Sequence, residues 1–384
     1  MKYLFVHDHI LNSYKNNYYS PGGLSNEVMK RYLFNDDDTI TLYTRQRLCE
    51  KKDLKKLVKV NDKRVFCEPS KLYHSPLDYY KKRKIIKNEV RKLVSEADFI
   101  IIRIPSFLGY FTYSEALKQN KKIILEMVAC PWDSLWNHSS ILGKLLAPLM
   151  YFKTKRVCKN AERIIYVSNE FLQNRYPTKG KSIAISNVNL KEIDESNLEK
   201  RIDKINNMNG VIKIGLIGSL NVNFKGHYEA IRMADILRNK GYKFEVHFLG
   251  SGNSSRWTKY IKKYHLENYV FFDGTLPSGE PVLKWMDTID IYLIPSLQEG
   301  LPRALIEAMS RGCPSVGMKT GGIPELLNRD MVCKRRNYCE LTNKVELLIN
   351  NQEKMIIEAT RNFNEAKKYL KSDLDEKRKK FFTE

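Results

Sequence analysis

The sequence lacks a long hydrophobic run and a regular cysteine pattern. No uninterrupted apolar stretch in its 384 residues reaches the roughly 20 residues that span a bilayer, so we expect no membrane-spanning helix. The first apolar run stops at His7-Asp8-His9, too early for a signal-peptide core, which predicts a cytoplasmic protein. The seven cysteines are scattered and odd in number, which is typical of reduced, structural thiols.

Acidic residues are also scarce relative to basic ones. The chain has 66 Lys and Arg against 44 Asp and Glu, a formal net charge of +22, which attracts nucleic acid, anionic lipid or phosphorylated ligands. No zinc-finger spacing, ribonucleoprotein signature or clear helix-turn-helix accompanies this charge, so we expect no nucleic-acid partner. Diphosphate ligands and an anionic membrane surface are the favoured partners, and a solvated basic surface without a partner is the alternative.

The stretch from 289 to 327 has the clearest organisation in the chain. A short apolar run, Ile291–Ile294, is bounded by Pro295 and predicts a buried parallel strand. A loop then leads to Pro302, which fits a first helical turn. The next segment, Arg303–Met309, has apolar residues at helical spacing and is closed by Gly312, so it predicts a helix.

Two glutamates flank the predicted start of this helix. The backbone amides around Gly300 lack helical partners and lie at the positive end of the helix dipole, which suits a diphosphate. Glu299 precedes the helix, and Glu307 lies five residues past Pro302, roughly 7 Å along the axis. Carboxylates accept hydrogen bonds from hydroxyls, so the pair predicts a nucleotide-sugar site. The alternative is that Glu307 only pairs with Arg303 on a solvated helix face.

The order of these motifs resembles the donor site of the retaining glycosyltransferases of family four. The matching residues are Glu299, seven intervening residues and Glu307, with Gly-Leu-Pro between them and Gly321-Gly322-Ile323-Pro324-Glu325 beyond. The resemblance covers nearly the whole chain and implies the GT-B fold, in which two doubly wound Rossmann-like α/β domains face each other across a cleft. It implies that Glu299 contacts the transferred sugar and Glu307 the ribose, with Gly300, Leu301 and Pro302 in the donor site.

The first half also carries matches to the family. Residues 4–6 predict the first strand, and Gly22 and Gly23 in the loop after it match the family's glycine-rich loop, which faces the donor. Residues 99–102 and 122–127 predict two further strands, and residues 212–217, 245–249 and 270–272 predict three in the second half.

The block 126–138 is similar to the acceptor-domain segment of capsular and exopolysaccharide transferases. Several relatives have a histidine directly after the strand that ends at Met127, but this chain has none before His138. We therefore expect Asp133 or His138 to face the acceptor. The alternatives are that Asp133 caps the next helix and that His138 packs among the neighbouring tryptophans.

A polar segment, 189–210, predicts a linker between two domains. Beyond it, Lys225 matches the family's phosphate-binding lysine, whose compact cation neutralises the leaving diphosphate. The family commonly has an arginine six positions before this lysine, where this chain has Ser219. One expected cation is therefore missing. The Gly250-x-Gly252 pair lacks the third glycine of a dinucleotide fingerprint, which argues against a dehydrogenase.

The segment from Tyr79 to Leu93 is strongly basic with apolar residues interleaved. It predicts an amphipathic helix that suits a membrane interface or an anionic lipid carrier. A solvated surface helix is the alternative.

Together these features predict an acceptor-binding domain at 1–190 and a donor-binding domain at 191–361, with a C-terminal helix at about 362–384 packing back on the first domain. The predicted activity is metal-independent, retaining transfer of a sugar from a UDP- or GDP-type donor to a saccharide acceptor in capsular, exopolysaccharide or other cell-surface glycan synthesis. The acceptor is expected to be lipid-linked, on the inner face of the cell membrane. No cofactor or metal is expected, since the central stretch has no Asp-x-Asp pair. The alternatives are a nucleotide-sugar epimerase, a phosphorylase or a non-catalytic binding member.

Overall fold

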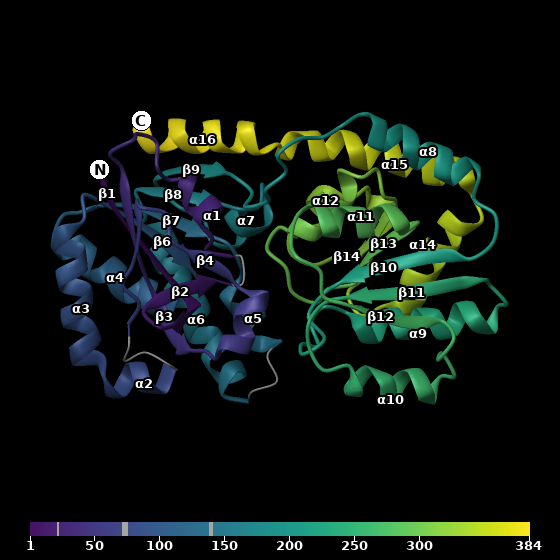
Figure 1. The fold of residues 1–384 in the computed structure, drawn as a ribbon, viewed down its shortest axis with the longest axis horizontal. Coiled ribbons are helices and arrows are strands. Elements are labelled where there is room, and N and C mark those ends of the chain that lie inside the picture. Colours follow the sequence, from purple (N-terminus) through teal and green to yellow (C-terminus); the bar gives the residue numbers. More distant parts are fainter. Residues whose placement is uncertain (21–22, 71–75, 138–140) are drawn as a thin grey trace.

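The structure, a computed structural model, describes residues 1–20, 23–70, 76–137 and 141–384. The chain forms two α/β halves that lie side by side, each built around a largely parallel sheet with helices packed against it (Figure 1). The C-terminal part of the chain crosses from the second half, where α15 lies, back to the first half, where α16 lies.

The first half contains β1 to β9 and α1 to α7. Its strands are β1 Lys2–Tyr14, β2 Asn17–Ser20, β3 Thr39–Leu48, β4 Val58–Val60, β5 Val65–Cys67, β6 Phe99–Ile104, β7 Lys122–Met127, β8 Arg163–Tyr166 and β9 Lys181–Ala184. Its helices are α1 Asn26–Lys30, α2 Pro76–Lys81, α3 Arg83–Glu96, α4 Phe107–Lys118, α5 Pro131–Trp136, α6 Ile141–Lys159 and α7 Phe171–Arg175, with a 3-10 turn at Lys51–Lys56.

The second half contains β10 to β15 and most of the remaining helices. Its strands are β10 Ile212–Ile217, β11 Phe244–Leu249, β12 Val270–Gly274, β13 Ile291–Ile294, β14 Ser315–Met318 and β15 Val332–Cys333. The helices are α8 Ser196–Asn206, α9 His227–Asn239, α10 Ser255–Lys263, α11 Glu280–Thr288, α12 Arg303–Met309, α13 Ile323–Leu326, α14 Tyr338–Ile349 and α15 Gln352–Ala366. The last helix of the chain, α16 Lys371–Thr383, lies on the first half.

Both sheets have the strand order of a doubly wound fold. The parallel strands of the first sheet lie in the order β5-β3-β1-β6-β7-β8-β9, and those of the second in the order β12-β11-β10-β13-β14-β15. In each sheet the strand that comes earliest in the chain, β1 or β10, has later strands added on both sides of it. The direction of strand addition therefore reverses beside that strand, which is the switch point of the sheet. Ligands of open α/β sheets bind at the carboxyl ends of the strands next to this point, here beside β1 and β6 and beside β10 and β13.

Strand β1 is longer than the sequence predicts. The apolar run predicts that it stops at His7, but it continues to Tyr14 after a register shift between Val6 and Ile10. Residues 10–13 pair with residues 45–48 of β3, and β2 pairs antiparallel with the end of β1. Backbone pairing with a strand distant in sequence, rather than apolar burial, continues this strand.

The segment predicted as a linker contains helix α8. Arg201 of this helix is buried and donates to the backbone carbonyls of Met286, Ile289 and Arg311 in the second half. This long cationic side chain binds carbonyl groups of the second half, so α8 is docked there, although most side chains of the segment are exposed. Half of the segment 189–210 is therefore a docked helix.

The segment from Tyr79 to Leu93 also has a structural role. It includes the end of α2 and most of α3, whose apolar residues Ile86, Val90, Leu93 and Val94 are buried. Tyr79 packs edge-on against the ring of Phe111. The apolar face predicted for lipid is thus part of the core, and the outward face of α3 is mainly cationic. None of the helices in the described ranges has the length and apolar character needed to span a bilayer.

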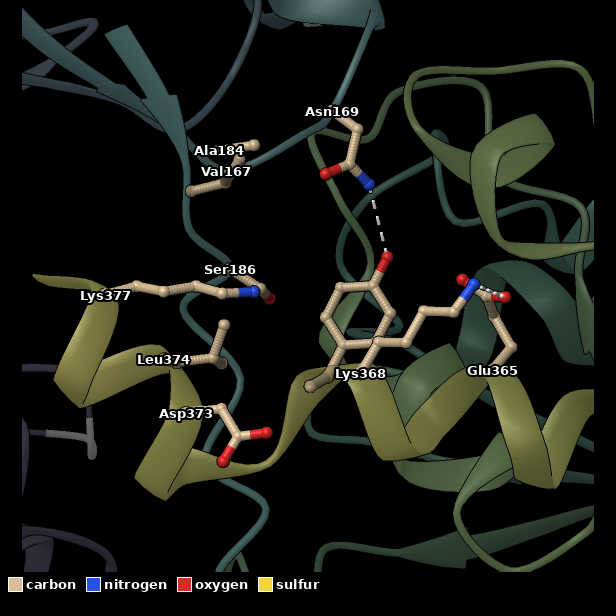
Figure 2. Close-up of a pocket in the computed structure, with 10 residues that line it drawn as sticks. Val167, Asn169, Ala184, Ser186, Glu365, Lys368, Asp373, Leu374 and Lys377 are labelled. Carbon is tan, nitrogen blue, oxygen red and sulfur yellow. Dashed lines mark hydrogen bonds and ion pairs between the residues drawn. The ribbon is translucent and has the colours of Figure 1, made fainter.

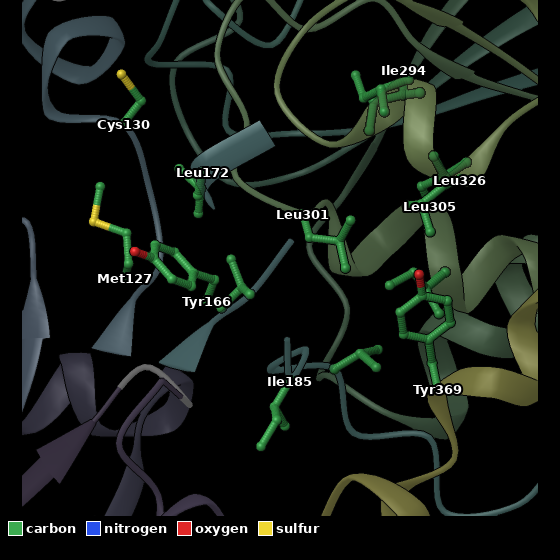
Figure 3. Close-up of a cluster of buried hydrophobic side chains, with 14 of the residues drawn as sticks. Met127, Cys130, Tyr166, Leu172, Ile185, Ile294, Leu301, Leu305, Leu326 and Tyr369 are labelled. Atoms are coloured by element: carbon green, nitrogen blue, oxygen red, sulfur yellow. The ribbon is translucent and has the colours of Figure 1, made fainter. Parts of the chain in front are cut away.

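The C-terminal segment predicted as a single helix is two helices, and the second packs on the first half. Helix α15 ends in the second half, and after a 3-10 turn and an extended residue, Leu370, helix α16 begins. Phe382 of α16 is buried, with ring centroids 5.3 Å from Phe34, 5.5 Å from Phe99 and 6.4 Å from Tyr3. The apolar core also continues between the halves, where Tyr166 and Leu172 belong to the same buried cluster as Leu301 and Leu305 (Figure 3).

We expect Phe382→Ala to destabilise the first half by about 3 kcal/mol, because it removes a buried ring from an aromatic cluster and leaves a cavity. Urea unfolding followed by tryptophan fluorescence measures this change. The neighbouring Lys380 has a largely exposed side chain, so Lys380→Ala is the matched control and should change stability by less than about 0.5 kcal/mol. Equal midpoints for the two variants would show that α16 does not stabilise the first half.

Candidate active site

An ion pair lies at the switch point of the second sheet. Lys225 follows β10, Glu299 follows β13, and the Lys225 Nζ lies 2.7 Å from the Glu299 Oε1. Their side chains are 28% and 10% exposed, so the pair is partly shielded but open to the solvent on one side. The structure therefore brings together the cation and the first of the two carboxylates that the sequence predicts for the donor.

The second carboxylate, Glu307, lies on α12, the helix that follows the Glu299 loop. It projects from α12 and is half-buried, and burial raises the pKa of its carboxyl group while the nearby Arg303 opposes that rise. No ion pair with Arg303 occurs among the described residues. Tyr292, which is fully buried on β13, also lies close to both glutamates: burial and then the charges of Glu299 and Glu307 raise the pKa of its hydroxyl.

A glycine pair supports the loop that carries Glu299. Gly322 donates its backbone N–H to the carbonyl oxygen of Gly300 at 2.6 Å. Gly321 has a positive φ of 56°, and a Cβ atom there would lie 2.3 Å from the carbonyl oxygen of Glu299. Only glycine allows this close approach. Leu301 and Pro302, which continue the loop, are buried, and Pro302 is the N-cap of α12 instead of part of its first turn.

The same loop contacts the first half of the molecule. A Cβ atom on Gly300 would lie 2.2 Å from the carbonyl oxygen of Val128, which follows β7. The carboxylate of Glu325, at the end of the Gly-Gly-Ile-Pro-Glu motif, accepts the backbone N–H groups of Asn169 and Phe171 at 2.6 and 2.7 Å. The motif thus has two structural functions: it supports the Glu299 loop and it ties the second half to the first.

We expect Gly300→Ala to lower turnover roughly 10- to 100-fold, since the added methyl group forces the two halves apart and displaces Glu299. Steady-state rates measure this effect. Nucleotide affinity should change less, because Lys225 and Glu307 both belong to the second half. A variant with wild-type turnover would show that the contact with Val128 is not needed in the reacting enzyme.

Helix α5 forms further contacts with the loop before Glu299. The Gln298 side chain donates to the Ser134 hydroxyl at 3.0 Å, and the Asn137 side chain donates to the Leu297 carbonyl at 3.2 Å. Arg335, on the loop after β15, donates to the Asn137 side chain at 2.9 Å and also to the Leu297 carbonyl. Sequence reasoning missed Arg335, and no local pattern distinguishes it from the basic residues beside it.

The predicted acceptor residues have different outcomes. Asp133 is buried in α5, where its carboxylate lies 3.2 Å from the Arg175 guanidinium. Asp133 does not cap this helix, because the N-cap is Cys130. His138 lies outside the described residues.

Of the two glycines predicted to face the donor, Gly22 lies outside the described residues. Gly23 lies against His9 of β1, since a Cβ atom there would be 3.2 Å from the ring. Burial and then the charge of Arg103 lower the pKa of His9 to about 4, so its ring is neutral at pH 7.

Comparison with known proteins places this chain in a family. The family model described as "Glycosyl transferases group 1" matches residues 212–351. Protein CapJ of Staphylococcus aureus is 34% identical over 368 residues, which cover 95% of this chain and 91% of CapJ. The chain belongs to the group 1 glycosyltransferases. The putative colanic acid biosynthesis glycosyltransferase WcaL of Escherichia coli is 38% identical over 113 residues, 28% of each chain.

Solved structures of glycosyltransferases agree with the fold. The Anabaena protein HepE, solved in complex with UDP-glucose, superimposes with a TM-score of 0.67 at 16% sequence identity, over 100% of this chain and 99% of HepE. The fold of this group 1 glycosyltransferase is GT-B, as the order of its sequence motifs implied.

Ser219 stands where the family commonly has an arginine, so this position supplies no cation. The Ser219 hydroxyl donates to the backbone carbonyl of Ser251 at 3.2 Å and thus remains in the loop after β10. Arg335 is a candidate replacement, because it lies at the Leu297 carbonyl, two residues before Glu299.

Two other observations concern ligands. Among the described residues, no group of three or more His, Cys, Asp or Glu side chains is arranged to hold a metal ion. A cavity of about 430 Å³ lies beside the turn between α15 and α16 (Figure 2). Asn169 and Ser186 line it from the first half. Lys368 and Tyr369 line it from the 3-10 turn between α15 and α16, and Lys377 from α16. None of the predicted donor residues that the structure describes lines this cavity.

Proposed function

We propose that this glycosyltransferase is a retaining enzyme that transfers a sugar from a UDP- or GDP-type nucleotide sugar to a saccharide acceptor. The Lys225–Glu299 pair carries the proposal. A cation at the carboxyl ends of β10 and β13 lies where doubly wound sheets bind their ligands, and it is held by a carboxylate from a neighbouring loop. When a donor binds, its diphosphate provides Lys225 with a second, more strongly charged partner.

In the proposed reaction each side chain has one task. Glu307 accepts hydrogen bonds from the ribose, Glu299 accepts them from the sugar, and Lys225 neutralises the charge that develops on the departing diphosphate. The bond from the anomeric carbon to the phosphate oxygen breaks, and the bond to the acceptor oxygen forms on the same face. The acceptor proton passes to the leaving phosphate. Arg335 adds a cation near the loop that carries Glu299, and Ser219 stands where the family commonly has an arginine.

We further propose that the acceptor is a lipid-linked saccharide in capsule or exopolysaccharide synthesis, used at the inner face of the membrane. The similarity to WcaL, whose name assigns it to colanic acid synthesis, supports this pathway class. Asp133 is the candidate acceptor-side residue, because α5 is tied to the Glu299 loop through Ser134 and Asn137.

A screen of nucleotide sugars by thermal shift identifies the donor, because a ligand that binds the folded state raises its melting temperature. Transfer to a soluble saccharide follows, with the anomeric configuration of the product read by NMR. Retention of configuration and release of the nucleoside diphosphate support the proposal. Inversion contradicts the retaining mechanism. A new nucleotide sugar formed without acceptor indicates an epimerase, phosphate-dependent turnover indicates a phosphorylase, and binding without transfer or hydrolysis indicates a non-catalytic protein.

A further inference from the structure

Helix α6 has a large exposed apolar face. Its outward side chains include Ile141, Leu142, Leu145, Leu149 and Phe152, each at least 52% exposed. Single exposed apolar residues are ordinary on protein surfaces, but five on one helix form a contiguous patch, which marks an interaction site. We call these five residues the α6 apolar face.

The helical geometry shows that this face is additional to the one that packs in the core. At 100° per residue, the α6 apolar face spans an arc of roughly 100°. The buried residues Gly143, Ala147, Met150, Thr154 and Cys158 lie on the opposite side. One side of α6 therefore packs in the core, and a second, apolar side faces outward.

Aromatic residues extend the patch from α5, which packs against α6. The rings of Trp132 and Trp136 stack at 5.4 Å, and Trp132 also packs edge-on against Tyr151 of α6. Trp136 is half-exposed. Tryptophan and tyrosine favour the boundary between an apolar phase and water, because their rings are apolar and carry one polar group.

The charge of α6 indicates which partner covers this face. Its sequence contains no acidic residue, and its five cations are all exposed: Lys144, Lys153, Lys155, Arg156 and Lys159. A second copy of the chain packed on this face would bring like charges together. An anionic lipid surface attracts these cations and accepts the apolar side chains below its headgroups.

We propose that the α6 apolar face is the surface by which the protein docks on an anionic lipid bilayer. The inference deepens the proposed function and rests on it for the lipid-linked acceptor. Helix α6 begins four residues after Asn137, whose side chain contacts the loop before Glu299, so its first Cα atom is within about 15 Å of the Asn137 Cα. Docking at α6 therefore places the membrane close to the acceptor side of the site.

The test measures partition of the full chain onto vesicles of phosphatidylglycerol mixed with phosphatidylcholine. The variant Leu145→Gln, Leu149→Gln and Phe152→Gln should bind at least roughly tenfold more weakly than wild type, because it removes apolar side chains that enter the lipid. Wild-type binding should fall with added salt and be weaker on pure phosphatidylcholine. The matched control, Leu117→Gln, Leu347→Gln and Ile357→Gln, changes three exposed apolar residues elsewhere and should bind like wild type.

Several results overturn the proposal: wild type that does not partition, equal partition of both triple variants, partition unaffected by lipid charge, or a wild-type dimer in solution that only the α6 variant loses. The last result identifies a second copy as the partner. Failure of the proposed function is seen separately, because a protein that binds vesicles but turns over no nucleotide sugar retains the docking surface and loses the activity. Transfer to a soluble acceptor by the α6 variant should remain at the wild-type rate.

Discussion

Lys225→Ala is expected to slow sugar transfer roughly 30- to 1000-fold, a loss of about 2–4 kcal/mol of transition-state stabilisation. The reason is that Lys225 is the cation proposed to act on the leaving diphosphate, and its ammonium group lies 2.7 Å from the Glu299 carboxylate. Affinity for the nucleoside diphosphate should fall as well. The variant also leaves the Glu299 carboxylate without its cationic partner.

A second lysine pair in the chain provides the control. Lys240 lies 2.7 Å from Glu346 on the surface of the second half, so Lys240→Ala breaks an ion pair of equal length outside the site. Steady-state transfer rates and calorimetry with the nucleoside diphosphate compare the two variants. If both lose activity to the same extent, general destabilisation explains the loss. If Lys225→Ala keeps full turnover, Lys225 does not act on the leaving group.

Substitution of the two glutamates should separate nucleotide binding from catalysis. Glu299→Gln should lower turnover tenfold or more, since its proposed partner is the sugar, whose interactions count most in the transition state. Its affinity for free nucleoside diphosphate should be at least that of wild type, because the change releases Lys225 from its ion pair. Glu307→Gln should instead weaken nucleoside diphosphate binding about fivefold, about 1 kcal/mol, by replacing a charged acceptor with a neutral one.

The pH dependence of nucleoside diphosphate binding tests the role of Glu307 separately. Burial raises the pKa of Glu307, so as the pH falls this carboxylate takes up its proton earlier than an ordinary glutamate. The charged acceptor is lost below the raised pKa, and wild-type affinity for the nucleoside diphosphate should fall with it. In Glu307→Gln this component is absent, so the ratio of the two affinities should approach one at low pH. If Glu299→Gln loses nucleotide binding while Glu307→Gln keeps it, the proposed donor orientation is reversed.

Local parts of the site could be predicted from the sequence. The predicted strand Ile291–Ile294 and helix Arg303–Met309 have the bounds found in the structure, because apolar runs, proline and glycine determine such elements locally. Contacts between the halves could not be predicted in this way. The ties from Glu325 to Asn169 and from Arg335 to Asn137 depend on how two separately formed sheets are placed.

The surface features show the same limit. Sequence reasoning selected the segment from Tyr79 to Leu93 for lipid because its charge is conspicuous, yet the apolar side of α3 packs in the core. It did not select α6, whose apolar residues alternate between a buried and an exposed side in a way that only the packed helix shows. Polar composition likewise hid helix α8, whose Arg201 binds carbonyl groups of the second half.

The return of α16 to the first sheet has a consequence for how the molecule is made. During synthesis all strands of the first sheet are translated long before Phe382 leaves the ribosome. The aromatic surface of Tyr3, Phe34 and Phe99 therefore stays exposed while the second half is translated. The first half is therefore the earlier to begin folding and the later to finish. A fragment cut at the boundary between the sheets would keep this surface exposed and be prone to aggregate, whereas the same fragment supplied with α16 as a separate peptide should recover solubility.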